Sequence, residues 1–249
     1  MRKVLSILLG IVCCATLLSA QTAEELVAKN TQAKGGIEKI KAIKSLKAMG
    51  QLESGGFRAQ LGWEAKRPEM YREMFTIQGM TQVQAYDGKT GWQISPFEGK
   101  KDPEMLGEDD LRSLEQSADF DGPLIDAAAK GNKIEYLGMD KVDGDDAYRL
   151  KVTLKSGDII YYYLDPETFL EFRTEKQQFI RGSIRESLTE YGSYKPFGGV
   201  LYPTSIEVGN RRSANRQKIT LHRIEVNLPL EDAAFHMPAA KTAAATPKK

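Results

Sequence analysis

The sequence predicts a mainly β domain, a sandwich or a barrel of about ten strands. From Leu46 onward, apolar and polar residues alternate with the period of two that is typical of half-buried antiparallel strands. Turn signals such as Asp87-Gly88, Ser156-Gly157 and Gly198-Gly199 recur about every ten residues. The composition, with 41% hydrophobic and 28% charged residues, is that of a globular chain. No parallel β/α order is evident.

The first twenty residues are expected to form a secretory signal peptide. Two basic residues, Arg2 and Lys3, precede an apolar run over residues 4–18 and a small-residue end at Ser19 and Ala20. The run is shorter than the ~20 residues that cross a bilayer, so cleavage near Ala20 is favoured over an uncleaved anchor. Cleavage removes the only two cysteines, and the exported chain must then be stabilised by burial without disulfides.

The mature chain is predicted to begin with a helix. Thr22 and Glu25 have the spacing of a capping box, and an apolar stripe from Leu26 to Ile43 is interrupted at Gly35-Gly36. The helix is therefore expected to break or bend at these glycines.

The strand pattern stops between Glu98 and Asp126. Leu111, Leu114 and Ala118 fall at helical spacings, and Gly122-Pro123 is expected to separate two short helices. This insert holds ten acidic residues against three basic ones, whereas the segment from Arg173 to Arg223 holds ten basic against four acidic. Among the latter, Arg211, Arg212 and Arg216 form either a solvated loop or a docking patch for an anionic lipid, a membrane surface or an acidic protein.

Several function classes are disfavoured. A net charge of +1 gives no electrostatic basis for binding nucleic acid, and two histidines with two cysteines leave no metal cluster. Gly88-Lys89-Thr90 lacks the earlier glycine of a phosphate loop and is interpreted as a hairpin turn. No nucleophile motif surrounds His222 or His236, so we expect no catalytic residue, no metal and no cofactor; a hydrolase that uses one of these histidines is the less favoured alternative.

Large and flexible apolar residues in the strands suit a barrel whose interior is not filled by side chains, although an ordinary core is the simpler interpretation for any one of them. The predicted cavity wall consists of Phe57, Leu61, Trp63, Met74, Tyr86, Trp92, Ile94, Leu170 and Phe172. Leu111 and Leu114 are predicted to form the inner face of a lid that hinges at Gly122-Pro123.

Four strings resemble the outer-membrane lipoprotein-sorting, LolA-like family. They are AYDGKTGWQISPF (85–97), DFDGPLID (119–126), YLDPETFLE (163–171) and NLPLEDAAFHMP (227–238). The opening AEELVAKNTQAKGG (23–36) looks like the first helix of that family. The similarity spans residues 22–238, nearly the whole mature chain, and none of the strings is a catalytic signature.

The resemblance implies a half-open antiparallel β-barrel of about ten or eleven strands, with an N-terminal helix and a short helical lid insert. It implies one lipid-carrier domain over residues 21–238. The last residues, which are Ala, Thr, Pro and Lys, have too few apolar groups to pack, so a disordered tail is expected over 239–249. The resemblance also implies a monomeric periplasmic carrier of lipoprotein acyl chains or lipids, moving cargo from an inner-membrane transporter to an outer-membrane acceptor. Arg58 and Arg72 are candidates for the polar cavity contact of this family. A lipid-sensing regulatory module of the same fold is the alternative.

Overall fold

The computed structural model describes residues 21–210 and 215–239. The predicted signal peptide, Arg211, Arg212 and residues 240–249 of the predicted tail lie outside the described residues. The helices are α1 (Ala23–Ala33), α2 (Ile37–Ala42) and α3 (Glu108–Ala118), with the short 3-10 helices η1 (Pro96–Glu98) and η2 (Asp232–Ala234). The strands are β1 (Ser45–Ser54), β2 (Phe57–Lys66), β3 (Met70–Ile77), β4 (Met80–Tyr86), β5 (Gly91–Ser95), β6 (Lys100–Met105), β7 (Lys133–Val142), β8 (Asp145–Thr153), β9 (Ile159–Leu164), β10 (Glu171–Ile180), β11 (Ser183–Phe197), β12 (Val200–Gly209) and β13 (Arg216–Val226).

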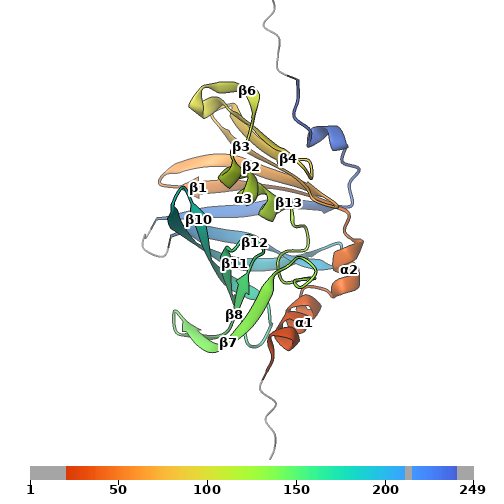
Figure 1. The fold of residues 1–249 in the computed structure, drawn as a ribbon, viewed down its shortest axis with the longest axis vertical. Helices are drawn as coiled ribbons and strands as arrows, with labels where there is room; N and C mark the ends of the chain where they lie inside the picture. The colour runs from red at the N-terminus through yellow and green to blue at the C-terminus, as the bar shows by residue number, and fades with distance from the viewer. Residues whose placement is uncertain (1–20, 211–214, 240–249) are drawn as a thin grey trace, which may run out of the picture.

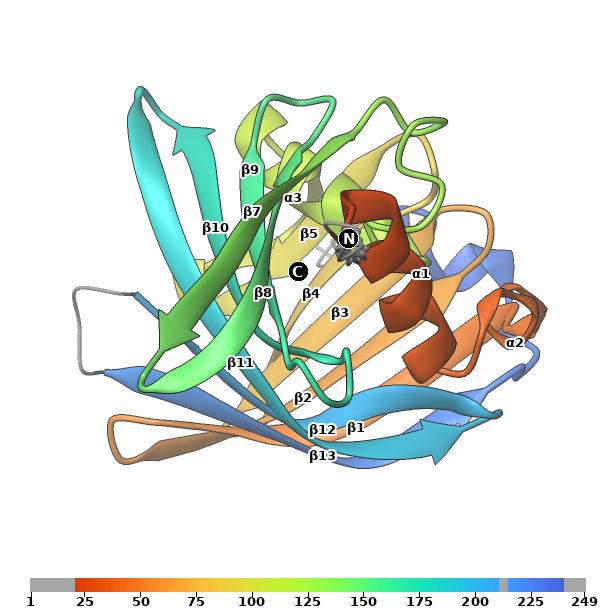
Figure 2. The same cartoon turned by 90° about the horizontal axis from the view of Figure 1, so that it is seen from below.

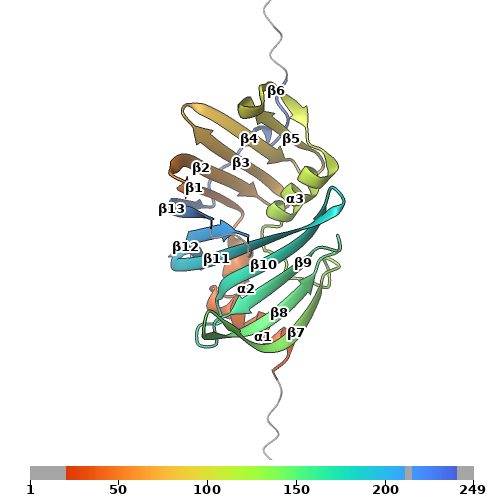
Figure 3. The ribbon, with the colours of Figure 1, turned by 90° about the vertical axis from the view of Figure 1, so that its left-hand side faces the viewer.

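All these strands belong to one antiparallel sheet, with the order β6-β5-β4-β3-β2-β1-β13-β12-β11-β10-β9-β8-β7 (Figures 1 and 3). The sheet does not close, because β6 and β7 form its two edges. The mainly β, half-open antiparallel architecture that the sequence predicts is therefore confirmed. The described residues form 13 strands, more than the expected ten or eleven.

The insert between β5 and β7 differs from its prediction in two ways. Lys100–Met105 pairs with β5 as an edge strand, although its charged residues and Pro103 hide the alternation. Only the first of the two expected helices forms, as α3, while residues 119–131 are turns and coil. The positive φ angles of Gly122 (76°) and Asp126 (54°) interrupt any helix there.

Three segments of the chain lie against one face of the sheet, around which the strands curl (Figure 2). Leu26 of α1 packs on Leu150, Val152 and Leu164, and α3 packs on Tyr86. Phe120, in the segment after α3, packs on the cluster that buried residues of β1 and β13 form. The strand registers place these contacts on a single continuous surface, called the concave face below; the opposite surface is the convex face.

The predicted start and break of the first helix are confirmed. The Thr22 hydroxyl accepts the Glu25 backbone N–H, and the Glu25 carboxylate accepts the Thr22 N–H, both at 3.2 Å. The chain then breaks between α1 and α2 at Gly35 (φ 125°) and Gly36 (φ 89°), where a side chain on Gly35 would collide with the backbone of Gly199.

A buried carboxylate fixes α1 to the sheet. Glu171, at the start of β10, accepts hydrogen bonds from Asn30 Nδ2 at 2.8 Å and from Lys34 Nζ at 2.5 Å. Asn30 also donates to the Phe169 carbonyl at 2.8 Å. Burial opposes ionisation of Glu171, but Lys34 and Asn30 outweigh that effect and lower its pKa.

Candidate functional site

The concave face carries a trough made of three adjoining pockets. A central pocket of about 210 Å³ shares Trp63 and Tyr71 with a pocket of about 420 Å³ on one side. It shares Ser117 and Asp119 with a pocket of about 470 Å³ on the other. The two outer volumes are within the range of small-molecule binding sites, about 300–1,000 Å³, and the central pocket is smaller. The shared residues make the three pockets one elongated site, called the trough below.

The floor of the central pocket is apolar because neighbouring strands each place aliphatic or aromatic side chains on the same face. Paired rows such as Ala48 with Trp63, and Ala48 with Ile224, continue the apolar surface from strand to strand. The side chains of this floor are Leu46, Ala48, Trp63, Ala65, Tyr202, Ile206, Leu221 and Ile224. Few backbone or charged groups interrupt it, so the floor suits a hydrocarbon ligand.

The pocket on the β2–β3 side has a mixed lining. Leu61 and Phe75 lie beside Gln82 and Glu73, and the Tyr71 hydroxyl donates to Glu73 Oε2 at 3.2 Å. Burial raises the pKa of Glu73 although the Tyr71 hydrogen bond acts in the opposite direction. A carboxyl group whose ionisation is disfavoured is compatible with an apolar ligand next to it.

The segment that covers the trough is formed by α3 and the residues after it. Leu111 and Leu114 pack with Tyr86, Leu106 and Tyr71, so both predicted lid residues lie in one cluster with the predicted wall residue Tyr86. Phe120 follows α3 and lies over the central pocket.

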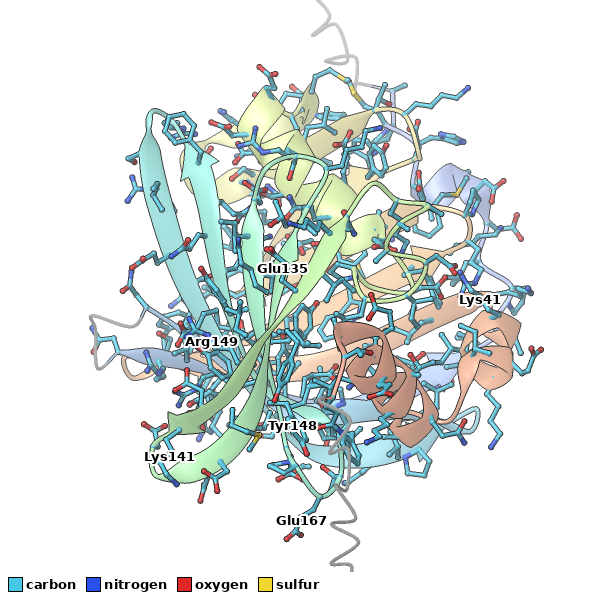
Figure 4. All side chains as sticks on the ribbon, turned by 60° about the horizontal axis from the view of Figure 1, so that its bottom comes forward. Lys41, Glu135, Lys141, Tyr148, Arg149 and Glu167 are labelled. Carbon is cyan, nitrogen blue, oxygen red and sulfur yellow. The ribbon has the colours of Figure 1, made fainter. Side chains whose placement is uncertain are left out.

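An ion-pair cluster holds the segment after α3. The Arg67 guanidinium contacts both carboxylate oxygens of Asp121, at 2.5 and 3.0 Å, and lies 4.5 Å above the Phe120 ring. Lys41 of α2, labelled in Figure 4, binds Asp121 at 2.5 Å and Asp126 at 2.6 Å. Burial opposes ionisation of Asp121, but Arg67 and Lys41 outweigh it and lower the pKa. Phe120 is therefore fixed over the trough by charged neighbours.

Four of the nine predicted wall residues, Phe57, Leu61, Trp63 and Met74, border the trough. Phe57, Leu61 and Trp63 alternate along β2 and line the same pocket. Tyr86 lies under α3, next to Tyr71, which lines the trough.

Trp92 and Ile94 lie on the other face of the sheet. Trp92 on β5 pairs with Ala85 on β4, and Ala85 pairs with Arg72 on β3. These three residues form one row across the sheet, and their side chains are on the convex face. There Val83, Ala85, Trp92, Met74 and Ile94 form a small core. The Trp92 indole N–H donates to the Phe235 carbonyl at 2.7 Å, so the segment after β13 covers this core. Met74 also borders the 420 Å³ pocket, next to Gly62.

The remaining predicted residues are also apart from the trough floor. Phe172 packs against Val142, Ala147 and Tyr163, and Leu170 lies in the turn between β9 and β10. Arg58 is paired with Glu53 at 2.8 Å, and Arg72 contacts Glu64 at 3.4 Å, both on the convex face. The structure does not bring these two arginines to the trough.

The floor residues of β12 and β13 were not predicted from the sequence. Tyr202, Ile206, Leu221 and Ile224 face the trough from strands that alternate as regularly as β2. The signal that could have identified them is the register between β1 and β13, which no single strand reveals.

The third pocket, on the β9–β11 side, is polar. Apart from Ile160, its strand residues carry hydroxyl groups and one ammonium group: Tyr162, Thr174, Lys176, Ser187, Thr189 and Tyr191. Arg112 and Gln116 of α3 reach the same pocket. Gln116 Nε2 donates to the buried Asp158 at 2.5 Å, and the Arg112 guanidinium lies 3.9 Å from it.

Exposed apolar side chains gather at one end of the sheet. In antiparallel order, the hairpins β1–β2, β3–β4, β5–β6 and β10–β11 all turn at the same end. The exposed large side chains there are Phe57, Met80, Phe97, Phe179 and Ile184, the last two being 62% and 67% exposed. Phe57 also lines the trough, so the trough reaches this end at the β1–β2 hairpin, whereas Phe179 and Ile184 pair with each other on the convex face.

Neither histidine has surroundings that indicate catalysis. His222 is exposed on β13, and His236 Nδ1 lies 3.1 Å from Asp87, which also accepts the N–H groups of its own turn. In residues 21–210 and 215–239, no three His, Cys, Asp or Glu side chains are grouped to hold a metal ion. Within the same residues, no helix has the length and apolar character of a membrane span.

No model of a protein family matches the sequence, and no curated protein matches it. Solved structures do match in fold. A DUF1329 family protein from Desulfovibrio piger has a TM-score of 0.59 at 13% identity, over 87% of this chain and 98% of that chain. A LolA superfamily protein from Nitrosomonas europaea has a TM-score of 0.57 at 14% identity, over 87% and 98%.

A third similar structure is an outer-membrane lipoprotein-sorting protein domain from Vibrio parahaemolyticus. Its TM-score is 0.55 at 10% identity, over 86% of this chain and 95% of that domain. At these identities the similarity concerns the fold alone. Together with the one open antiparallel sheet and its few helices, it shows that this chain has the LolA-like fold.

Proposed function

We propose that this protein is a periplasmic binder and carrier of acyl chains, belonging to lipoproteins or lipids, which it holds in the trough. The observation that carries the proposal is the apolar floor around Trp63, Leu221 and Ile224, open at one end and covered by Phe120. A packed core would leave no room for a ligand there.

The energetics are those of reversible binding. Transferring ~15 methylenes from water at ~0.8 kcal/mol each gives a gross gain on the order of 10 kcal/mol. Loss of translational freedom and ordering of the chain offset several kcal/mol of that gain. The resulting affinity is sufficient for capture and weak enough for release to an acceptor.

The similar structures from Nitrosomonas europaea and Vibrio parahaemolyticus support a role in lipoprotein sorting. In that role the chain takes its cargo from an inner-membrane transporter and delivers it to an outer-membrane acceptor. Catalysis is not part of the proposed role, which needs no cofactor.

The two tryptophans provide the test, because the chain has only these two. Trp63 lines the trough, whereas Trp92 lies on the convex face beneath Phe235. The variant Trp92→Phe leaves Trp63 as the only indole, and Trp63→Phe leaves Trp92. Each variant is titrated with dibromostearic acid, whose bromine atoms quench indole fluorescence at short range, and with stearic acid as the control.

We expect dibromostearic acid to quench Trp63 in the Trp92→Phe protein and to leave Trp92 unquenched in the Trp63→Phe protein. Stearic acid should quench neither. Equal quenching of both tryptophans, or of Trp92 alone, would contradict a site in the trough. No quenching of either, with no lipid retained in native mass spectrometry, would contradict acyl-chain binding itself.

A further inference from the structure

The chemistry of the concave face changes along the trough. Over β1, β2, β12 and β13 it is apolar, whereas over β9, β10 and β11 it presents hydroxyl groups around Lys176. Ser117 and Asp119 line both the polar pocket and the central one, so the two regions adjoin. A ligand lying in both would have a hydrocarbon tail at one end and a polar group at the other.

Lys176 is half-buried in this polar region without a direct counter-ion. Its neighbours across the sheet are Ser187 on β11 and Ile160 on β9. No carboxylate of the described residues lies within 4 Å of its ammonium group, although Asp158 is near enough to favour the charge. Burial lowers the pKa of Lys176, and the nearby Arg112 acts in the same direction.

Asp158 does not complete the pairing because its carboxylate is already engaged. It accepts hydrogen bonds from Gln116 at 2.5 Å and from Gln178 at 3.4 Å, and Arg112 lies 3.9 Å away. A partly desolvated ammonium group that lacks a direct partner is costly, and an incoming anion would remove this cost.

The acidic residues of the same pocket lie elsewhere in it. Asp119 is paired with Lys130 at 2.5 Å. Glu69 precedes β3 and Glu115 is on α3, and both are exposed to solvent, which screens their charge. The side of the pocket formed by β10 and β11 therefore favours an anion, whereas the side formed by α3 does not.

We propose that Lys176, with the hydroxyl groups of Ser187 and Thr189, binds the anionic head group, a phosphate or a carboxylate, of an amphiphile whose tail lies on the apolar floor. This inference rests on the proposed function, because it names the class of ligand for the same trough. Charge-assisted hydrogen bonds from an ammonium and two hydroxyls suit either oxyanion.

The test compares ligands that share one acyl chain and differ only in the head group. The probes are palmitoyl lysophosphatidic acid, which has a phosphate head group, palmitic acid, which has a carboxylate, and palmitoyl glycerol, which has a neutral head group. Dissociation constants are measured by titration calorimetry for the wild type, Lys176→Gln and Lys218→Gln. Lys218 is exposed on β13, so the last variant removes the same charge outside the trough.

For the wild type, we expect at least one anionic probe to bind about tenfold or more tightly than palmitoyl glycerol, as for hydrogen bonds to a charged group. Lys176→Gln should abolish this preference and leave the affinity for palmitoyl glycerol within about twofold, since tail burial is unchanged. Lys218→Gln should bind all three probes like the wild type. The stronger of the two anionic probes identifies the head group as phosphate or carboxylate.

Equal wild-type affinities for the three probes would overturn the head-group site while leaving acyl binding intact. So would an anionic preference that persists in Lys176→Gln. Tighter binding of hexadecylamine, a fourth probe with a cationic head, would place the head near Glu115 instead and also contradict the inference. Failure of every probe to bind would refute the proposed function itself. The wild-type comparison needs no variant, so the test does not depend on whether Lys176→Gln folds.

Discussion

Replacing Arg67 by methionine should loosen the segment that covers the trough. The guanidinium binds both oxygens of Asp121 and donates to the carbonyls of Ile43 at 2.7 Å and Ile40 at 3.1 Å. It therefore joins α2, the end of β2 and the segment that carries Phe120. The side chains of Arg67 and Asp121 are only 20% and 6% exposed, so this is a largely buried pair.

The loss of stability in Arg67→Met arises because the buried Asp121 carboxylate loses its main partner. Asp121 keeps Lys41 at 2.5 Å but loses two charge-assisted hydrogen bonds. Breaking a buried pair by removing one partner costs about 3–5 kcal/mol. We expect about 3 kcal/mol in the free energy of unfolding, at the low end of that range, because the partly exposed Lys41 still compensates the carboxylate.

A double-mutant cycle with Asp121→Asn separates the pair from other effects. Asp121→Asn leaves the guanidinium without its carboxylate, whereas Arg67→Met/Asp121→Asn removes both charges. The double variant should be more stable than the sum of the single effects predicts, by about 2 kcal/mol, as for residues in direct contact. Urea unfolding measures all four proteins. Additivity within about 0.5 kcal/mol would refute the assignment of this pair as a clamp.

Three further predictions concern stability. Leu26→Ala should lower the free energy of unfolding by about 2–5 kcal/mol, because Leu26 is fully buried against the sheet; urea unfolding with an unchanged m-value would measure this loss. Glu171→Gln should cost about 3–5 kcal/mol and speed amide exchange throughout α1, since Lys34 then has no charged partner; unchanged exchange would argue against this anchor. Asp121 and Glu171 have lowered pKa values when folded, so their stabilisation is complete above the unfolded pKa of ~4 and is lost as the pH falls through the folded values. The melting temperature should therefore vary little between about pH 5 and 7 through these groups and fall below about pH 4, less steeply in Asp121→Asn than in the wild type.

The strands were predictable because, in a strand with one buried and one exposed face, apolar and polar residues alternate along the sequence. The same pattern does not say which face is concave. Trp63 and Trp92 each stand in an apolar strand context, yet one lines the trough and the other is 4% exposed beneath Phe235. The difference arises from strand register and from the segment after β13, which are long-range features.

The strings that resemble the LolA-like family are where distant parts of the chain are joined. Phe235, in the last string, accepts the hydrogen bond of Trp92 in the first. Asn30, in the first helix, donates to Phe169 in the third string. Asp121, in the second string, binds Arg67. Such contacts require particular side chains and so leave recognisable motifs, whereas the trough floor requires only apolar residues, spread singly over several strands.

The place where the trough opens depends on the same contacts. The predicted hinge at Gly122-Pro123 is itself held in place: Asp121, directly before it, is bound by Arg67, and the Gly122 carbonyl accepts a hydrogen bond from Lys130 at 2.7 Å. Opening there must break largely buried ion pairs, which costs several kcal/mol. The end of the trough at the hairpin turns carries exposed apolar side chains. There α3 is tied to the β10–β11 turn by solvent-exposed hydrogen bonds, from Arg112 to the Phe179 carbonyl at 2.7 Å and from the Arg181 N–H to Asp109 at 3.2 Å, which cost less to break than the buried Arg67 pair.

Acyl chains should therefore enter at the hairpin end while Phe120 stays in place. If so, Arg67→Met changes stability but leaves the rate of stearic acid exchange between protein and vesicles within about twofold. If the segment after α3 is the gate, the clamp limits opening, and its loss should speed exchange by about tenfold or more, because each 1.4 kcal/mol removed from a barrier is a factor of ten. Exchange kinetics of this one variant thus separate a trough that is entered along its length from one that opens by lifting its cover.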